Sequence, residues 1–229
     1  MTKASQDFLD SLVNEFEHHK NPSIGKQQKA YMKNNFEFLG LKAPVRKEIL
    51  RPFFIKSFLP PKSDLDALVR ILWNNPYREF QMAAQELAYK YNKHIDDKDI
   101  ELYEFMITTK SWWDTVDFIA AKLVGDYFKK YPNQIGKYIQ KWINSDNMWL
   151  QRTAILFQLK YKNQLDPKLL KYIIQSQLGS NEFFINKAIG WVLREYSKTN
   201  PTWVFNFVNT NEKGLSNLSK REALRLMKK

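Results

Sequence analysis

Residues 133–161 read NQIGKYIQKWINSDNMWLQRTAILFQLKY, and this stretch decides the fold. Its apolar residues recur at the 3.6-residue period of an amphipathic helix, first over NQIGKYIQKWINS and again around Ala154. Asn133 follows a proline, which is a signal for the start of a helix. The stretch therefore predicts two consecutive helices.

The same two-helix unit recurs along the chain at intervals near 34 residues. N-cap and first-turn proline signals open first helices with spacings of 33, 36, 33 and 34, at Asp64, Asp97, Asn133, Asp166-Pro167 and Asn200-Pro201. The second helices align on a small residue with spacings of 36, 34 and 34, at Ala84, Ala120, Ala154 and Ala188. A helical hairpin cannot bury its apolar face alone, so we expect an all-α solenoid, a superhelix of HEAT-like two-helix repeats.

The first 60 residues predict a helical N-terminal cap. QDFLDSLVNEFEHHK at 6–20 has the pattern of one amphipathic helix, which Asn21-Pro22 ends. A basic helix follows, and Pro44 starts another helix that we expect to reach Phe58. Because no long linker interrupts the chain, we expect one domain over 1–229, with the cap at 1–60 and the repeats at 61–229.

The net charge indicates an anionic partner. The chain holds 36 Lys and Arg against 24 Asp and Glu, a difference of +12. Such an excess favours nucleic acid first and an anionic membrane surface second. No segment approaches the roughly 20 apolar residues of a membrane span. The start of the sequence lacks the apolar centre of a signal peptide, so we expect a cytoplasmic protein.

Other chemistries lack their motifs in this sequence. There is no cysteine, which excludes disulfides, thiolate metal sites and a cysteine nucleophile. His18 and His19 are adjacent and His94 stands alone, so no metal-ligand spacing occurs. Neither GxGxxG nor GxxxxGK[ST] is present. We therefore expect neither a metal nor an organic cofactor.

Positive charge is concentrated in residues 137–171, where seven Lys and Arg stand against two acids. Helical-repeat proteins usually bind on their concave face, and a curved basic surface suits a duplex nucleic acid whose phosphates it neutralises. The candidate phosphate contacts are Lys137, Lys141, Lys160 and Lys162. For each lysine taken singly, a solvated side chain without a ligand is the plain alternative.

The segment KSWWDTVD at 110–117 is the densest candidate for chemistry. Trp113 and Asp117 are four residues apart, so they share one helix face. Asp114 has the place of an N-cap or first-turn acid, and Trp112 that of a core or hinge residue. An acid on a basic binding surface needs a reason, and Asp117 has no acidic equivalent in the other repeats, which carry Gln81, Gln151 and Ile185.

Arg152 and Trp191 extend this candidate site. Successive repeats stack in register, so Asp117, Arg152 and Trp191 can line one groove. In that interpretation the indoles contact sugar or base, the guanidinium holds a phosphate, and the carboxylate faces a developing cation. Two structural alternatives stay open: a salt bridge between Arg152 and Asp117, and core packing of Trp191.

At these residues the sequence resembles the AlkD-like DNA alkylation-repair glycosylases, which are built from HEAT-like repeats. The resemblance covers nearly the whole chain, through AYMKNNFEFLGLKAPVR at 30–46, SWWDTVD at 111–117, LQRTA at 150–154 and NKAIGWVLREYSK at 186–198. It implies that the active-site residues are Trp113, Asp117, Arg152 and Trp191. It also implies that Tyr31 faces DNA, while Lys42 stands where some relatives have glutamine.

The resemblance further implies an activity. The substrate would be duplex DNA carrying purines alkylated at ring nitrogens, such as 3-methyladenine and 7-methylguanine. The enzyme would be a monofunctional, cofactor-free N-glycosylase of base excision repair. Asp117 would stabilise an oxocarbenium-like deoxyribose for attack by water, without a base-flipping pocket. The resemblance implies a monomer of bacterial-type cytoplasmic location, DNA-associated, with no membrane and no obligate protein partner.

Two other functions remain to be distinguished from this one. The first is a helical-repeat protein that binds DNA or RNA structure without catalysis. The second is a peptide-binding scaffold, whose mark would be an apolar or acidic groove in place of a basic surface.

Overall fold

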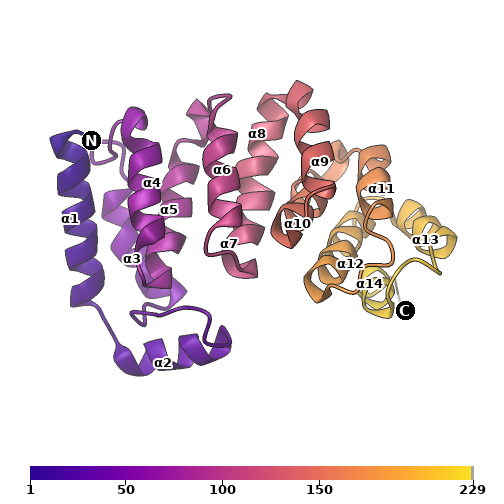
Figure 1. Cartoon of the computed structure of the whole chain (residues 1–229), viewed down its shortest axis with the longest axis horizontal. Coiled ribbons are helices and arrows are strands. Elements are labelled where there is room, and N and C mark those ends of the chain that lie inside the picture. Colours follow the sequence, from indigo (N-terminus) through magenta and orange to yellow (C-terminus); the bar gives the residue numbers. More distant parts are fainter. Residues whose placement is uncertain (228–229) are drawn as a thin grey trace. The chain divides into compact units, whose positions relative to one another are not determined.

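The computed structural model describes residues 1–227, and its regular elements are helices (Figure 1). Within these residues the only extended pairing is a single bridge between Glu37 and Tyr77. Lys228 and Lys229, at the end of the predicted domain, lie outside the described residues. The predicted all-α fold is confirmed. None of the helices in residues 1–227 combines the length and the apolar character that crossing a bilayer needs.

The chain forms two compact units, one from Met1 to His94 and one from Ile95 onward. The expectation of a single domain with a cap over 1–60 stays a prediction. The helices of the first unit are α1 (Lys3–His18), α2 (Pro22–Tyr31), α3 (Ala43–Phe53), the short Lys62–Asp64, α4 (Leu65–Asn74), α5 (Arg78–Lys90) and the short Asn92–His94.

The third helix is shorter than the sequence pattern predicts. α3 ends at Phe53 and not at Phe58. After Phe54 the chain turns, and this turn brings the Phe58 ring back to Phe53 and Phe8, with centroids 5.5 and 6.1 Å away. The apolar residue that extended the helical pattern therefore packs on the α1–α3 contact from outside the helix.

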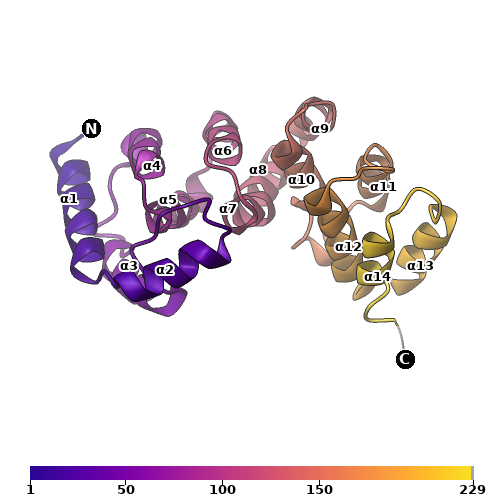
Figure 2. The ribbon, with the colours of Figure 1, turned by 60° about the horizontal axis from the view of Figure 1, so that its bottom comes forward.

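The second unit consists of helix pairs in two layers. Its helices are α6 (Asp99–Thr108), α7 (Trp113–Phe118), the π-helical Ile119–Val124, α8 (Gly125–Lys130), the short Pro132–Gln134, α9 (Ile135–Ile143), α10 (Met148–Leu156), the short Lys162–Gln164, α11 (Pro167–Gln175), α12 (Phe183–Ser197), α13 (Pro201–Thr210) and α14 (Asn217–Ala223). Figure 2 shows α6, α9 and α11 in one layer, and α7–α8, α10 and α12 in the other. We call these the first and second layers.

The aligned small residues explain why the helices pack at this spacing. All four side chains are fully buried, namely Ala84, Ala120, Ala154 and Ala188. A methyl group lets neighbouring helices approach closely while larger apolar residues fill the space beside them. Three residues further on, Leu87, Leu123 and Phe157 are buried, whereas Trp191 is only half-buried. Trp191 is therefore not completely buried, and the choice between core packing and contact with a ligand stays a prediction.

The predicted caps are found at the last two pairs only. At the second and third pairs the N-caps of α6 and α9 are Lys98 and Gln134 in place of Asp97 and Asn133, because a short turn or 3₁₀ helix precedes each helix. At the first pair Asp64 has another role. Asp166 accepts hydrogen bonds from the backbone N–H groups of Lys168 and Leu169, and Asn200 accepts one from Trp203. Asp64 instead accepts bonds from Thr2 and Ser5, and these bonds lower the pKa of Asp64 to about 2. Asp64 thereby fastens the start of α1 to the start of α4.

Candidate functional site

The centre of the candidate site is an ion pair between Asp117 of α7 and Arg152 of α10. Arg152 Nε donates to Asp117 Oδ1 at 2.7 Å, and Nη2 donates to Oδ2 at 2.8 Å. Two parallel N–H···O bonds form a bidentate pair, which fixes the planes of the guanidinium and the carboxylate relative to each other. The salt bridge considered from sequence is thus present, and it holds the carboxylate in one orientation.

The guanidinium has a third partner on α12. Arg152 Nη1 donates to the backbone oxygen of Phe184, and the Arg152 side chain is only 3% exposed. The resemblance implies that Arg152 holds a phosphate. In this structure its three nitrogens bond to protein groups, so Arg152 joins α7, α10 and α12 and orients Asp117.

An aromatic cluster supports the ion pair. The ring of Phe184 lies 5.1 Å from Trp112 and 5.0 Å from Trp149, between centroids. The Arg152 guanidinium carbon lies 5.8 Å from the Phe184 centroid. Trp112 is therefore a packing residue, as expected, and the cluster fixes the part of α12 that bonds to Arg152.

Asp117 lies just before an irregular segment of its helix. The hydrogen-bond pattern changes from α-helical to π-helical over Ile119–Val124 and returns to α-helical at Gly125. Short π-helical segments inside α-helices occur frequently at functional sites, because the extra residue re-aims the side chains beside it. Nothing in the apolar pattern of this stretch predicted the irregularity.

Partial burial raises the pKa of Asp117. Its side chain is 16% exposed. Burial raises the pKa of Asp117 above the ordinary aspartate value, Arg152 opposes that shift, and the nearby Asp114 adds to it. The carboxylate is thus a stronger base than a surface aspartate and still reaches solvent.

Both candidate tryptophans lie in the second layer with Asp117. Trp113 begins α7, one turn before Asp117, and is half-buried. Trp191 lies seven residues after Phe184 on α12, which is about two helical turns on the same side. Helices α7, α10 and α12 therefore present Trp113, Asp117, Arg152 and Trp191 from one layer.

The four predicted lysines divide between two places. Lys137 and Lys141 are on α9 in the first layer, and Lys141 pairs with Glu104 at 2.7 Å. Lys160 and Lys162 are exposed and follow α10, and Lys162 lines a pocket of about 210 Å³ with Glu195 of α12 and Lys198, which follows that helix. Contact of all four lysines with DNA therefore stays a prediction.

Tyr31 and Lys42 belong to the first unit. Tyr31 is the last residue of α2 and is 73% exposed, and Lys42 is the exposed N-cap of α3. The loop between them is held by the buried Glu79, whose carboxylate accepts the backbone N–H groups of Leu39, Gly40 and Leu41 at 2.9–3.0 Å. The surface that carries both residues is therefore fixed.

Two cations on α12 were not predicted from the sequence. Lys187 precedes Trp191 by four residues and Arg194 follows it by three, so all three share a helix face. The helix as a whole is not strongly basic, because Glu195 offsets one of its two cations. Counting charge along the face of Trp191 would have found both residues.

Comparisons with known proteins identify the family of the chain. The family model of the DNA alkylation repair enzymes matches residues 12–227. No curated protein matches the chain. A solved structure described as a predicted DNA alkylation repair enzyme from Enterococcus faecalis is 32% identical, with a TM-score of 0.84, covering 92% of this chain and 97% of that one. The chain therefore belongs to the DNA alkylation repair enzyme family.

Proposed function

We propose that this protein is a monofunctional DNA glycosylase that removes cationic alkylated purines, of the 3-methyladenine and 7-methylguanine type, from duplex DNA in base excision repair. The observation that carries the proposal is the Asp117 carboxylate, held by two bonds from Arg152 yet 16% exposed. An ionised acid fixed on a second-layer surface with two tryptophans suits a reaction that develops positive charge on a sugar.

The substrate makes little demand for acid catalysis. A purine alkylated at a ring nitrogen is cationic, so when the N-glycosidic bond breaks its electron pair stays with the base, which leaves neutral. The deoxyribose is left with oxocarbenium character, as in glycoside hydrolysis. The required group is an anion near that sugar, and Asp117 supplies it.

Asp117 also has the chemistry of a general base. Water attacks the anomeric carbon, a C–O bond forms, and the proton passes to the carboxylate. The raised pKa of Asp117 makes the carboxylate a better proton acceptor than an ordinary aspartate. Arg152 keeps it ionised and oriented, which is the role that its buried bonds support.

The two tryptophans complete the contact surface. Both are half-buried, so each presents part of its ring while the rest is packed. An indole face attracts positive charge and packs against the sugar–phosphate backbone. Gripping the backbone on both sides of a lesion makes a base-flipping pocket unnecessary in this proposal.

A non-catalytic DNA-binding role is the second candidate, and one observation favours it. The Asp117–Arg152 pair satisfies both charges and joins three helices, so it has a structural role regardless of chemistry. In that case DNA would bind and no base would leave.

Base release from methylated duplex DNA tests the proposal. We expect the wild-type protein to release free 7-methylguanine and leave an intact abasic strand. Asp117→Asn should lose most of this release, by about 100-fold or more, while its affinity for a duplex with an abasic-site analogue stays near the wild-type value. Release by Asp117→Asn at the wild-type rate would exclude Asp117 as the catalytic group, and binding without release by the wild type would favour the second candidate.

A further inference from the structure

One face of α12 is only partly covered by the protein core and by α14. Ile185, Ala188 and Val192 bury the core face of the helix. α14 covers a second face so closely that a Cβ on Gly190 would lie 2.6 Å from Cβ of Glu222. The remaining face carries a stripe at positions i, i+4 and i+7, namely Lys187, Trp191 and Arg194, and the C-cap residue Lys198 follows it.

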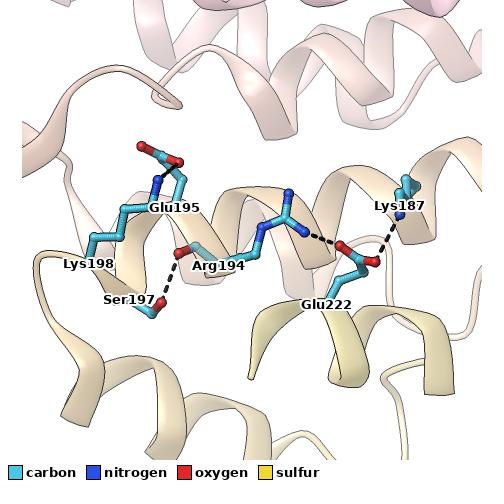
Figure 3. Close-up of polar contacts among 6 residues, drawn as sticks. All are labelled: Lys187, Arg194, Glu195, Ser197, Lys198 and Glu222. Atoms are coloured by element: carbon cyan, nitrogen blue, oxygen red, sulfur yellow. Dashed lines mark hydrogen bonds and ion pairs between the residues drawn. The ribbon is translucent and has the colours of Figure 1, made fainter. Parts of the chain in front are cut away.

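Two cations of this stripe share one carboxylate. Lys187 Nζ donates to Glu222 Oε1 at 3.0 Å, and Arg194 Nη1 donates to Glu222 Oε2 (Figure 3). Figure 3 shows the two side chains reaching the acid of α14 from either side. Glu222 is 10% exposed, whereas Lys187 and Arg194 are 40% and 22% exposed. The acid is more deeply buried than either cation.

This arrangement keeps positive charge and fixes its position. Two cations against one anion leave a net charge of +1 beside Trp191. Hydrogen bonding to Lys187, with the nearby charges of Lys187 and Arg194, lowers the pKa of Glu222, so the acid stays ionised at neutral pH. A long side chain held in one place loses less entropy when it binds a ligand.

We propose that Lys187 and Arg194 form a binding site for a DNA backbone phosphate beside Trp191, and that Glu222 is a positioning residue that holds both cations. The proposal rests on the proposed function for its ligand, duplex DNA, and not on base release. The remaining N–H donors of the guanidinium and the ammonium group suit phosphate oxygens.

Substitution of Glu222 gives a test by sign. Glu222→Gln removes a negative charge next to the bound DNA. If Glu222 only offset the charge of the two cations, it would weaken DNA binding in the wild type, and the substitution would tighten binding. If Glu222 positions the two cations, we expect the opposite result, a Kd about fivefold higher for Glu222→Gln. Without the acid, the Lys187 and Arg194 side chains must be ordered when DNA binds. The probe is a fluorescent duplex with an abasic-site analogue, measured by anisotropy.

The cations themselves are tested by salt dependence. Lys187→Gln and Arg194→Gln should each lower the slope of log Kd against log salt by about 0.9, as expected for one lost phosphate contact. Lys98→Gln is the matched control, because it removes the same charge from an exposed residue at the start of α6 in the first layer. Slopes equal to that of Lys98→Gln would overturn the phosphate site.

A double-mutant cycle separates positioning from folding. In a Lys187→Gln/Arg194→Gln background, Glu222→Gln should no longer raise the Kd, because the cations through which the acid acts are gone. A rise that persists in this background, or tighter binding by Glu222→Gln alone, would overturn the positioning role. Thermal unfolding of each variant confirms that the folded protein is being measured.

Base release from the same DNA keeps the two proposals distinct. Wild-type release with unchanged salt slopes in the variants would remove the phosphate site and leave the glycosylase. Reduced slopes without any wild-type release would remove the glycosylase and leave the phosphate site.

Discussion

One position in the repeat, three residues before the aligned alanine, has two different uses. In the first unit Gln81 is fully buried, and its Nε2 donates to the backbone oxygens of Leu72, Trp73 and Asn75 at 3.3, 2.9 and 2.8 Å. In the second unit Gln151 donates to Ser145 O at 2.7 Å. Each amide closes the turn between the two helices of its own pair.

The pair that contains Asp117 departs from this pattern. An ionised carboxylate has no hydrogen to donate, so it cannot bond the carbonyls of its turn. There, Ser111 Oγ donates to Ile107 O instead, and Asp117 turns to Arg152 of the next pair. Local rules are usually broken at functional sites. The amides thus serve the fold, whereas Asp117 serves the chemistry in the function that we propose.

The largest expected effect comes from removing the partner of Asp117. Arg152→Met leaves a buried acid unpaired, so the free energy of unfolding should fall by about 3 kcal/mol. Since Arg152 opposes the rise in the pKa of Asp117, that pKa should rise further. Urea unfolding measures the first effect, and base release should fall more at pH 6 than at pH 8. Equal losses at both pH values would contradict the role of Arg152 in keeping Asp117 ionised.

Gln81→Met should affect stability alone. Methionine has a similar length but no N–H, so three carbonyls at the end of α4 lose their donor, at a cost of about 2 kcal/mol. Urea unfolding checks this value. If the variant kept wild-type stability, the role of Gln81 in stabilising the fold would be wrong.

Gln151→Met should produce a smaller version of the same effect. One half-buried hydrogen bond is lost, so we expect about 1 kcal/mol of destabilisation by urea unfolding. Base release per folded molecule should stay near the wild-type rate, although the neighbouring residue is Arg152. A large loss of rate would show that base release depends on this position in the pair of Gln151 as well as in the pair of Asp117.

The mildest change leaves the sequence intact and varies pH. The raised pKa of Asp117 means that its ionised form is complete at high pH and is lost as pH falls through that value. We expect the enzyme-dependent rate of base release to change little between pH 8 and 7 and to fall at acid pH, starting above the range of an ordinary aspartate. Spontaneous depurination is subtracted with Asp117→Asn as the blank. A rate that rises as pH falls would indicate an acid catalyst instead.

The repeat could be predicted because it rests on periodicity. The aligned alanines are core residues in every pair, and the caps at Asp166 and Asn200 use short-range bonds that sequence specifies. The early end of α3 could not be predicted, because Phe58 continues the apolar pattern while lying outside the helix. The π-helical segment after Asp117 likewise depends on tertiary packing.

The sequence led to the four candidate residues but not to all the contacts that they make. Spacing and resemblance pointed to Trp113, Asp117, Arg152 and Trp191, and the pairing of Arg152 with Asp117 was one of the two alternatives. The bond from Arg152 to Phe184 joins residues 32 apart, and no local pattern encodes it. Glu222 was missed for the same reason, because it lies 35 residues from Lys187.

Asp117 and Gln151 occupy the same position, three residues before the aligned alanine of their repeats. We propose that Asp117 takes part in catalysis and that Gln151 only stabilises the fold. Single-turnover release of 7-methylguanine by Asp117→Asn and Gln151→Met, each corrected for its folded fraction, tests this most directly. We predict a loss of about 100-fold or more for Asp117→Asn and a rate close to wild type for Gln151→Met. Equal losses in the two variants would contradict the claim.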